Sequence, residues 1–286
     1  MPIENNWVVA SDIGGTHITS AIVDLSSWKV LEYTICRNQV NSRSDAKSIL
    51  QSWVASISET IRLSDTDIQH LGIAMPGPFD YENGISMMKN QDKYDDLYQV
   101  DVQIALKDIL GSQFSIRFIN DAAAFLQGEV FAGNLQHHPK VLGITLGTGL
   151  GSAVWEQGQK AFDADLWNTP YKESIFEEFL VTRWFIKRFF ELSGFQEKGF
   201  RDILTKHREK EAFETLLLEY TDVLYDFLCY FSEKHGCKTF ILGGNISKAW
   251  GVISGYNTYK LRQFDIHIGQ QTEHAAIIGA GSLFKK

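Results

Sequence analysis

The chain contains two short glycine-rich turns, each set between two apolar segments, and this repeated pattern constrains the fold more than any other feature. The first turn is Asp12-Ile-Gly-Gly-Thr16 and the second is Gly147-Thr-Gly-Leu-Gly151. Apolar runs separated by glycine are typical of β-strands joined by a sharp reversal. We therefore predict two strand-turn-strand segments at equivalent positions of a duplicated α/β fold.

Helical and extended patterns follow each of these segments. Apolar residues at spacings of three and four predict helices over 44–61, 100–110, 122–131, 174–190, 209–233 and 273–284. Short apolar runs predict strands over 7–11, 18–23, 30–36, 71–74, 114–119, 141–146, 152–155 and 239–242. With 286 residues the chain has room for two lobes, predicted as 1–119 joined by the terminal helix within 273–286, and 120–272. Because ligands of such sheets bind at the carboxyl ends of strands, a cleft between the lobes is the expected site.

The composition argues against several classes of function. Acidic residues (35) outnumber basic ones (27) and no basic stripe occurs, so nucleic-acid binding is not expected. No segment approaches the roughly 20 apolar residues that span a bilayer, and residues 1–7 lack the features of a secretory signal. Cys36, Cys229 and Cys237 form neither a CxxC pair nor a disulfide spacing. We therefore expect a cytoplasmic protein that does not bind membranes.

Both glycine turns are candidate phosphate-binding sites. Where Cβ atoms are absent, the main chain can approach phosphate oxygens closely, and each turn adds a threonine hydroxyl. Either turn alone could equally be an ordinary hairpin, and neither matches a P-loop or a dinucleotide-binding fingerprint. The candidate contacts are Gly14, Gly15, Thr16, Gly147, Thr148 and Gly149.

Three polar side chains are predicted at the ends of strands. Asp12 ends the first strand, where it could orient Mg²⁺ beside a nucleotide or simply begin an Asx turn. Asn120 and Asp121 end another strand and begin a helix, where helix capping is the usual role. A phosphoryl acceptor, however, needs a carboxylate within hydrogen-bond reach of its hydroxyl. Asp121 could supply that carboxylate while Asn120 holds a neighbouring sugar hydroxyl.

In order and spacing these motifs resemble those of the ROK family, which is named for its repressors, open reading frames and kinases. The resemblance runs along nearly the whole chain. The matching segments are Asp12 to Thr16, Gly72 to Pro78 followed by Gly84 and Asn90, Asn120-Asp121 with Gly128-Glu129, Gly147 to Gly151, Leu242 to Ile246, and Ala276 to Gly281.

This resemblance implies a two-lobed, duplicated actin-like (ribonuclease H-like) fold with an interlobe cleft. It also implies an ATP-dependent kinase, assisted by Mg²⁺, that phosphorylates a hexose or amino-hexose with Asp121 as the general base. The sugar contacts implied are Gly77, Asn90, Asn120, Asp121, Asp165 and Glu177. Gly243 and Gly244 are implied to lie against the nucleotide.

The chain departs from the family pattern in the region of the sugar and zinc motifs. Family kinases usually carry Gly-Glu-x-Gly-His, a cysteine-rich zinc loop and then Cys-Leu-Glu, whereas this chain has Ala164-Asp-Leu-Trp-Asn168 and Ile175-Phe-Glu177. Without those thiolates and that histidine, zinc is not expected. Glu177 matches the last family glutamate, and Asp165 is a looser match to the earlier one.

Three histidines are assigned no ligand role. His17 replaces a lysine that is common in the family, and as a strand residue it is expected to be a packing or surface side chain. His137 and His138 precede Pro139 in a polar loop without a partner at ligand spacing, so a solvated loop is expected.

Two alternatives to a kinase stay open at this stage. The altered sugar segment also fits a ROK-like sugar sensor with little or no turnover, and an actin-like ATPase would act without a small acceptor. A family repressor would need a helix-turn-helix before Asp12, where only eleven residues stand in this sequence. The aromatic stripe within 213–231 is expected to be core or subunit interface, and a homodimer would fit it.

Overall fold

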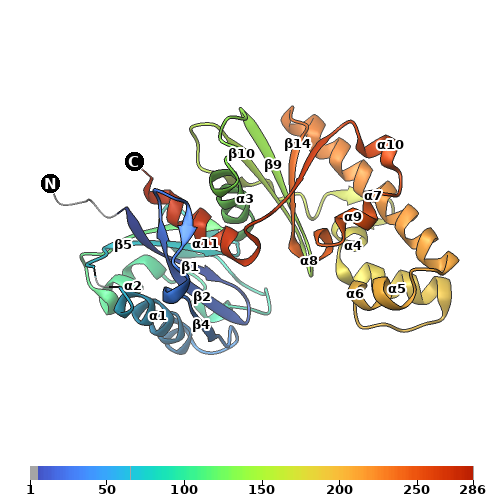
Figure 1. Ribbon diagram of the computed structural model, residues 1–286. Helices are drawn as coiled ribbons and strands as arrows, with labels where there is room; N and C mark the ends of the chain where they lie inside the picture. Colours follow the sequence, from blue (N-terminus) through green and yellow to red (C-terminus); the bar gives the residue numbers. More distant parts are fainter. Residues whose placement is uncertain (1–5, 65, 286) are drawn as a thin grey trace. The chain divides into compact units, whose positions relative to one another are not determined.

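The computed structural model describes residues 6–64 and 66–285, which form two compact units (Figure 1). Unit 1 contains the described residues of 1–137, 158–162 and 273–286, and unit 2 contains 138–157 and 163–272. The division falls after His137 rather than after residue 119, because the helix that begins at Asp121 packs within unit 1. Residues 1–5, which include most of the segment examined for a secretory signal, lie outside the described residues.

Unit 1 is built on a six-stranded sheet in the order β3-β2-β1-β5-β8, with β4 also paired to β2. Its strands are β1 (Trp7–Ile13), β2 (His17–Asp24), β3 (Lys29–Val30), β4 (Cys36–Gln39), β5 (His70–Met75) and β8 (Ser115–Asn120). β1 and β2 are antiparallel around the first glycine turn, which confirms the predicted strand-turn-strand segment. β1, β5 and β8 are parallel to one another. A separate hairpin pairs β6 (Phe79–Asp80) with β7 (Ile85–Ser86).

The strand predicted over 30–36 was wrong. A 3-10 helix, η1 (Glu32–Thr34), separates β3 from β4. The buried Thr34 hydroxyl donates to the Leu31 carbonyl oxygen and accepts from the Ile22 N–H. The Thr34 hydroxyl therefore accepts the Ile22 N–H in place of a backbone carbonyl group of a neighbouring strand. The apolar pattern alone did not reveal this.

Helices cover both faces of the unit 1 sheet (Figure 1). α1 (Ala46–Arg62) and α2 (Val102–Leu110) share one apolar core with the sheet. α3 (Asp121–Ala132) and α11 (Ala275–Gly281) pack together on the other face. These two helices touch at glycines, since a Cβ on Gly128 would lie 1.9 Å from the Ala275 oxygen and one on Gly279 would lie 1.9 Å from the Ala124 oxygen. The helix predicted over 273–284 is thus α11 flanked by 3-10 turns η3 (Thr272–His274) and η4 (Ser282–Phe284).

Unit 2 has a five-stranded sheet in the order β11-β10-β9-β14-β15. The strands are β9 (Lys140–Leu146), β10 (Leu150–Glu156), β11 (Phe162–Asp163), β14 (Thr239–Gly243) and β15 (Asp265–Ile268). β9 and β10 are antiparallel around the second glycine turn, and β9, β14 and β15 are parallel. The second strand-turn-strand segment is therefore also confirmed. β15 and helix α6 (Phe200–Lys206) had not been predicted.

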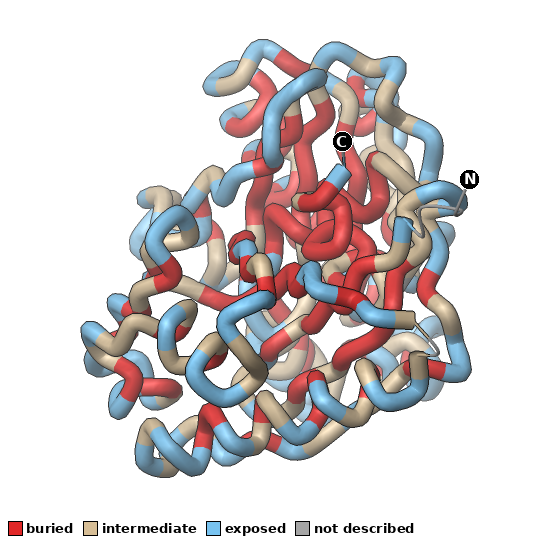
Figure 2. The backbone as a smooth tube through the Cα atoms, turned by 90° about the vertical axis from the view of Figure 1, so that its left-hand side faces the viewer, coloured by how far each residue is buried: buried red, intermediate tan, exposed pale blue. Residues whose placement is uncertain are grey.

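The helices of unit 2 enclose an aromatic core. Along the helical stretches of the backbone that face the viewer in Figure 2, buried and exposed residues alternate. The remaining helices are α4 (Glu177–Leu180), α5 (Thr182–Ser193), α7 (Glu211–His235), α8 (Gly244–Ser247), α9 (Trp250–Ile253) and α10 (Thr258–Leu261). The predicted stripe on α7 is fully buried, so it belongs to the core and not to a subunit interface: Phe213, Leu216, Leu217, Tyr220, Leu224, Phe227 and Phe231. No helix among the described residues is both long and apolar enough to span a membrane.

The single helix predicted over 174–190 was wrong as well. β13 (Ser174–Ile175) pairs with β12 (Pro170–Tyr171), and α4 and α5 are then separated at Val181, whose backbone is extended. The break occurs because both the N–H and the hydroxyl of Thr182 donate to the Gly147 carbonyl oxygen, at 2.8 and 2.9 Å.

Candidate functional site

Parallel pairing in unit 1 brings the predicted acidic residues to one edge of the sheet. Asp12 on β1 is in register with Ala74 on β5, and Ala74 is in register with Ile119 on β8. Gly77 follows β5, and Asn120 and Asp121 follow Ile119 directly. The carboxyl ends of these strands therefore gather Asp12, Gly77, Asn120 and Asp121, as expected for a ligand-binding edge.

Asp12 and Asp121 are electrostatically unfavourable neighbours. Burial and then the Asp121 carboxylate raise the pKa of Asp12 from its ordinary 3.8 to about 7, Glu273 adds to this effect, and Arg37 opposes it. Asp121 is exposed to solvent, yet desolvation by the surrounding protein still raises the pKa of its carboxyl group. Two carboxylates with raised pKa values form a place where a cation would relieve repulsion and a proton can be accepted.

Asn120, rather than Asp121, caps helix α3. The Asn120 Oδ1 atom accepts from the N–H groups of Ala122 and Ala123 at 2.9 and 3.1 Å, and its Nδ2 donates to the Tyr81 hydroxyl at 3.3 Å. The Asp121 Oδ1 atom accepts only from the Ala122 N–H, at 2.9 Å, and Oδ2 makes no hydrogen bond among the described residues. Asn120 therefore caps the helix, and the adjacent Asp121 carboxylate is not needed as the cap.

Nothing within unit 1 requires glycine in the first turn. Neither Gly14 nor Gly15 has a positive φ, and a Cβ on either would come no closer than 3.6 Å to described atoms. The Gly14 N–H closes the turn on the His17 carbonyl oxygen at 2.9 Å, and His17 Nδ1 lies 2.9 Å from the Thr16 hydroxyl. The space beside the turn is what a phosphate group approaching the main chain would need.

Two residues near this turn, Lys93 and Tyr94, were not found from the sequence. The buried Tyr94 ring packs edge-on against Trp53 at 5.4 Å, and its hydroxyl donates to the Gly14 carbonyl oxygen at 2.5 Å. The Lys93 Cδ atom lies 4.0 Å from where a Cβ on Gly15 would be, and the lysine charge lowers the pKa of Asp121. No local pattern links positions so far apart in the sequence, so no sequence signal could have shown this contact.

Asn90 lies in the same loop as Lys93 and Tyr94. Its side chain is exposed and its backbone is left-handed, with φ of 57°. Asparagine tolerates this conformation better than most residues. The structure therefore places Asn90 on an exposed bend.

In unit 2 the second glycine turn is held by three side chains. A Cβ on Gly147 would meet nothing within 4 Å, so here too the unit itself does not require glycine. Thr182 holds the Gly147 carbonyl group, and Arg183 donates to the Thr148 carbonyl oxygen at 3.2 Å. Glu177 Oε2 accepts from the Leu150 N–H at 3.0 Å.

The two predicted sugar carboxylates of unit 2 already have partners within the chain. Besides its bond to the turn, Glu177 pairs through Oε1 with Arg183 at 3.0 Å. Asp165 is exposed, has a left-handed backbone with φ of 50°, and accepts from the Trp167 indole N–H at 2.8 Å. Glu177 thus has a structural role that the family pattern did not reveal.

Gly243 and Gly244 lie beside the second turn. Gly243 ends β14 in register with Thr145 of β9. Gly244 has φ of +85°, and a Cβ there would lie 2.3 Å from the Leu146 carbonyl oxygen, so local structure requires this glycine. The predicted nucleotide residues of unit 2 therefore share one edge of its sheet.

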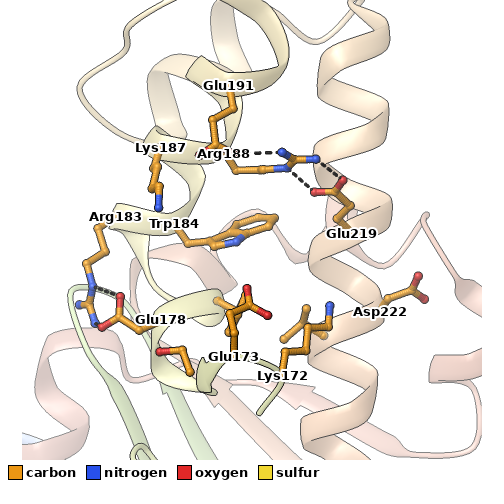
Figure 3. A pocket seen from close by; sticks show the side chains of 13 residues that line it. Lys172, Glu173, Glu178, Arg183, Trp184, Lys187, Arg188, Glu191, Glu219 and Asp222 are labelled. Carbon is orange, nitrogen blue, oxygen red and sulfur yellow. Dashed lines mark hydrogen bonds and ion pairs between the residues drawn. The ribbon is translucent and has the colours of Figure 1, made fainter.

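A pocket of about 860 Å³ in unit 2 is separate from these residues (Figure 3). Charged side chains of α5 and α7 line it, and ion pairs join Arg183 to Glu178 at 2.7 Å and Arg188 to Glu219 at 2.6 Å. None of the predicted site residues lines this pocket. Arg183 is nevertheless common to the pocket and to the second turn.

Together the fold and the site define a two-unit α/β protein in which each unit presents a glycine turn at the carboxyl ends of parallel strands. The family model described as "ROK family" matches residues 8–162, and the chain belongs to that family. A glucokinase from Thermotoga maritima is 23% identical over 320 residues, covering 98% of this chain and 97% of that protein.

Solved structures share the whole fold. A glucokinase from Parabacteroides distasonis has a TM-score of 0.79 at 18% identity, covering 98% of both chains. A ROK family glucokinase from Streptomyces griseus, in complex with glucose and AMPPNP, has a TM-score of 0.74 at 17% identity, covering 97% of this chain and 98% of that chain. These likenesses confirm the predicted two-domain actin-like fold.

Proposed function

We propose that this protein transfers the γ-phosphoryl group of ATP to a hydroxyl group of a hexose or amino-hexose. The observation that carries the proposal is the meeting of Asp121 with the first glycine turn at one sheet edge, where Asn120 already serves as the helix cap. Membership of the ROK family and the similarity to a glucokinase support it.

Asp121 is the proposed general base. Its Oδ2 atom makes no hydrogen bond within the described chain, and its raised pKa suits it to accept the sugar hydroxyl proton as the phosphoryl group leaves ATP. Asn120 Nδ2 donates one hydrogen bond to Tyr81 and retains a second N–H for a sugar hydroxyl. Gly77 and Asn90 are the other proposed sugar contacts of unit 1.

The phosphates of ATP are assigned to the first glycine turn. Gly14, Gly15 and Thr16 offer backbone N–H groups and a hydroxyl, and the Lys93 ammonium group, which makes no hydrogen bond or ion pair among the described residues, offers a positive charge. Asp12 would hold Mg²⁺ through a carboxylate oxygen or a bound water, and the repulsion between Asp12 and Asp121 fits that role. When bound, Mg²⁺ neutralises charge that develops on the phosphoryl oxygens.

Unit 2 is proposed to contact the nucleotide through its own glycine turn and the end of β14. The contacts are Gly147, Thr148, Gly149, Gly243 and Gly244. Glu177 and Asp165 stay proposed sugar contacts, because an ionised carboxylate has about four acceptor positions and their internal bonds leave some unused. The three cysteines are free thiols, which supports the proposal of a cytoplasmic enzyme.

The test is ADP release measured across hexoses, N-acetylhexosamines and ketoses with Mg²⁺-ATP, with the phosphorylated product identified by phosphorus NMR. We expect ADP release that depends on one class of sugar and is lost in Asp121→Asn. Equal ADP release without sugar would instead indicate an ATPase. Sugar binding without ADP release would indicate the sensor.

A further inference from the structure

Three metal-ligating side chains come together in unit 2, away from the candidate active site. They are His138, which precedes β9, and Asp265 and His267 on β15. One ligand atom from each residue lies within 4.8 Å of those of the other two. The expectation that His138 had no ligand partner was wrong, because the parallel order β9-β14-β15 brings distant parts of the sequence together.

The geometry of this cluster suits a metal ion better than an ordinary ion pair. Asp265 and His267 are two residues apart on one strand, so their side chains lie on the same face of the sheet. His267 Nε2 lies 3.1 Å from Asp265 Oδ1, yet this buried nitrogen atom makes no hydrogen bond among the described residues. The His138 ring lies edge-on to the His267 ring, with centroids 6.2 Å apart.

We propose that His138, Asp265 and His267 form a binding site for a divalent transition metal ion, of which Zn²⁺ is the representative. Imidazole and carboxylate ligands suit Zn²⁺, and two ligands at 2.0–2.2 Å in a tetrahedral shell lie about 3.4 Å apart. The 3.1 Å separation of two ligand atoms is close to that value, and all three ligand atoms lie within 4.8 Å of one another. A water molecule would complete the shell.

The expected consequence is structural. A bound ion would fasten the segment before β9 to the edge strand β15, and so stabilise the folded state of unit 2 by mass action. The site is separate from the segment between Asp165 and Glu177, where the family's zinc loop would stand. It uses none of the residues assigned to ATP or sugar, so it stands or falls independently of the proposed kinase activity.

Calorimetric titration of tag-free, chelator-treated protein with Zn²⁺ tests the proposal, with Co²⁺ absorption as a second readout of ligand number and geometry. We expect one ion per chain and a higher melting temperature with Zn²⁺ but not with Mg²⁺, which prefers oxygen ligands. His267→Gln and His138→Gln should each weaken binding at least tenfold. His137→Gln, the adjacent exposed histidine, is the matched control and should bind normally.

Circular dichroism checks that each variant is folded, and Asp265→Asn supplies a further ligand variant if a histidine substitution disturbs the fold. Absence of stoichiometric Zn²⁺ binding by the parent protein overturns the proposal. Equal binding by folded His267→Gln and parent also overturns it.

Discussion

The Asp12→Asn substitution should make unit 1 more stable while removing activity. Burial and the Asp121 carboxylate raise the pKa of Asp12 to about 7, so the ionised form is disfavoured in the folded protein. A carboxylate with a raised pKa costs no stability below its unfolded value of 3.8, costs progressively more as the pH rises to about 7, and costs a constant amount above that. Asparagine has nearly the same shape and removes that cost at every pH.

The size of the effect follows from the two pKa values. A difference of about three pH units at about 1.4 kcal/mol each sets an upper limit of roughly 4 kcal/mol. Asp12 keeps some contact with solvent, which screens the repulsion, so we expect about 2 kcal/mol at pH 8 and a smaller gain at pH 5. For a domain of this size, about 2 kcal/mol raises the melting temperature by about 4–8 °C.

Thermal denaturation followed by circular dichroism in EDTA, from pH 5 to pH 8.5, measures the difference. The control is Asp108→Asn, an exposed carboxylate on α2, which should change the free energy of unfolding by less than about 0.5 kcal/mol at every pH. Mg²⁺ with nucleotide should reduce the difference in melting temperature between Asp12→Asn and the parent protein, because it stabilises the parent alone. A lower melting temperature for Asp12→Asn at pH 8, or a difference independent of pH, would refute the reasoning.

Three further substitutions test individual contacts in steady-state kinetics. Asp121→Asn should lower kcat by roughly 10²-fold or more without lowering the melting temperature, since the helix cap is a different residue; a destabilised variant with normal kcat would assign Asp121 to structure. Tyr94→Phe should raise the KM for ATP about 2- to 13-fold by losing one hydrogen bond to the phosphate turn, whereas the buried control Tyr220→Phe should spare KM. Glu177→Gln should raise the KM values for both ATP and sugar, because the same carboxylate holds the second turn; a rise for sugar alone would show that this bond does not position the turn.

Local sequence patterns predicted the parts of the fold that depend on neighbouring residues. The glycine turns, the flanking strands and the helix after Asp121 lie within one or two residues of their predicted positions, because period and turn chemistry are set locally. The break before Thr182 could not be predicted, since its cause is a hydrogen bond to Gly147. Non-local contacts of this kind override helical periodicity.

For the candidate site, too, the sequence predicted some residues and missed others. Asp12 and Asp121 stand out in the sequence because each lies next to the predicted end of a strand, and strand ends in a parallel sheet meet at one edge. The contact between Tyr94 and Gly14 joins two segments 80 positions apart, and the cluster around His267 depends on the order of strands in a sheet. Neither leaves a pattern within any one stretch of sequence.

The packing of α11 against α3 has a consequence for synthesis of the chain. Unit 2 is complete once residue 272 has been made, whereas unit 1 still lacks α11, whose close contacts with α3 pass through Gly128 and Gly279. Domains fold as units during translation, so the second unit can finish before the first. Until residues 275–281 emerge from the ribosome, one face of β1 and β5 stays uncovered, and the helix that begins at Asp121 lacks the partner it packs against. The nascent chain therefore leaves the part of the sheet that α11 covers exposed throughout synthesis of unit 2.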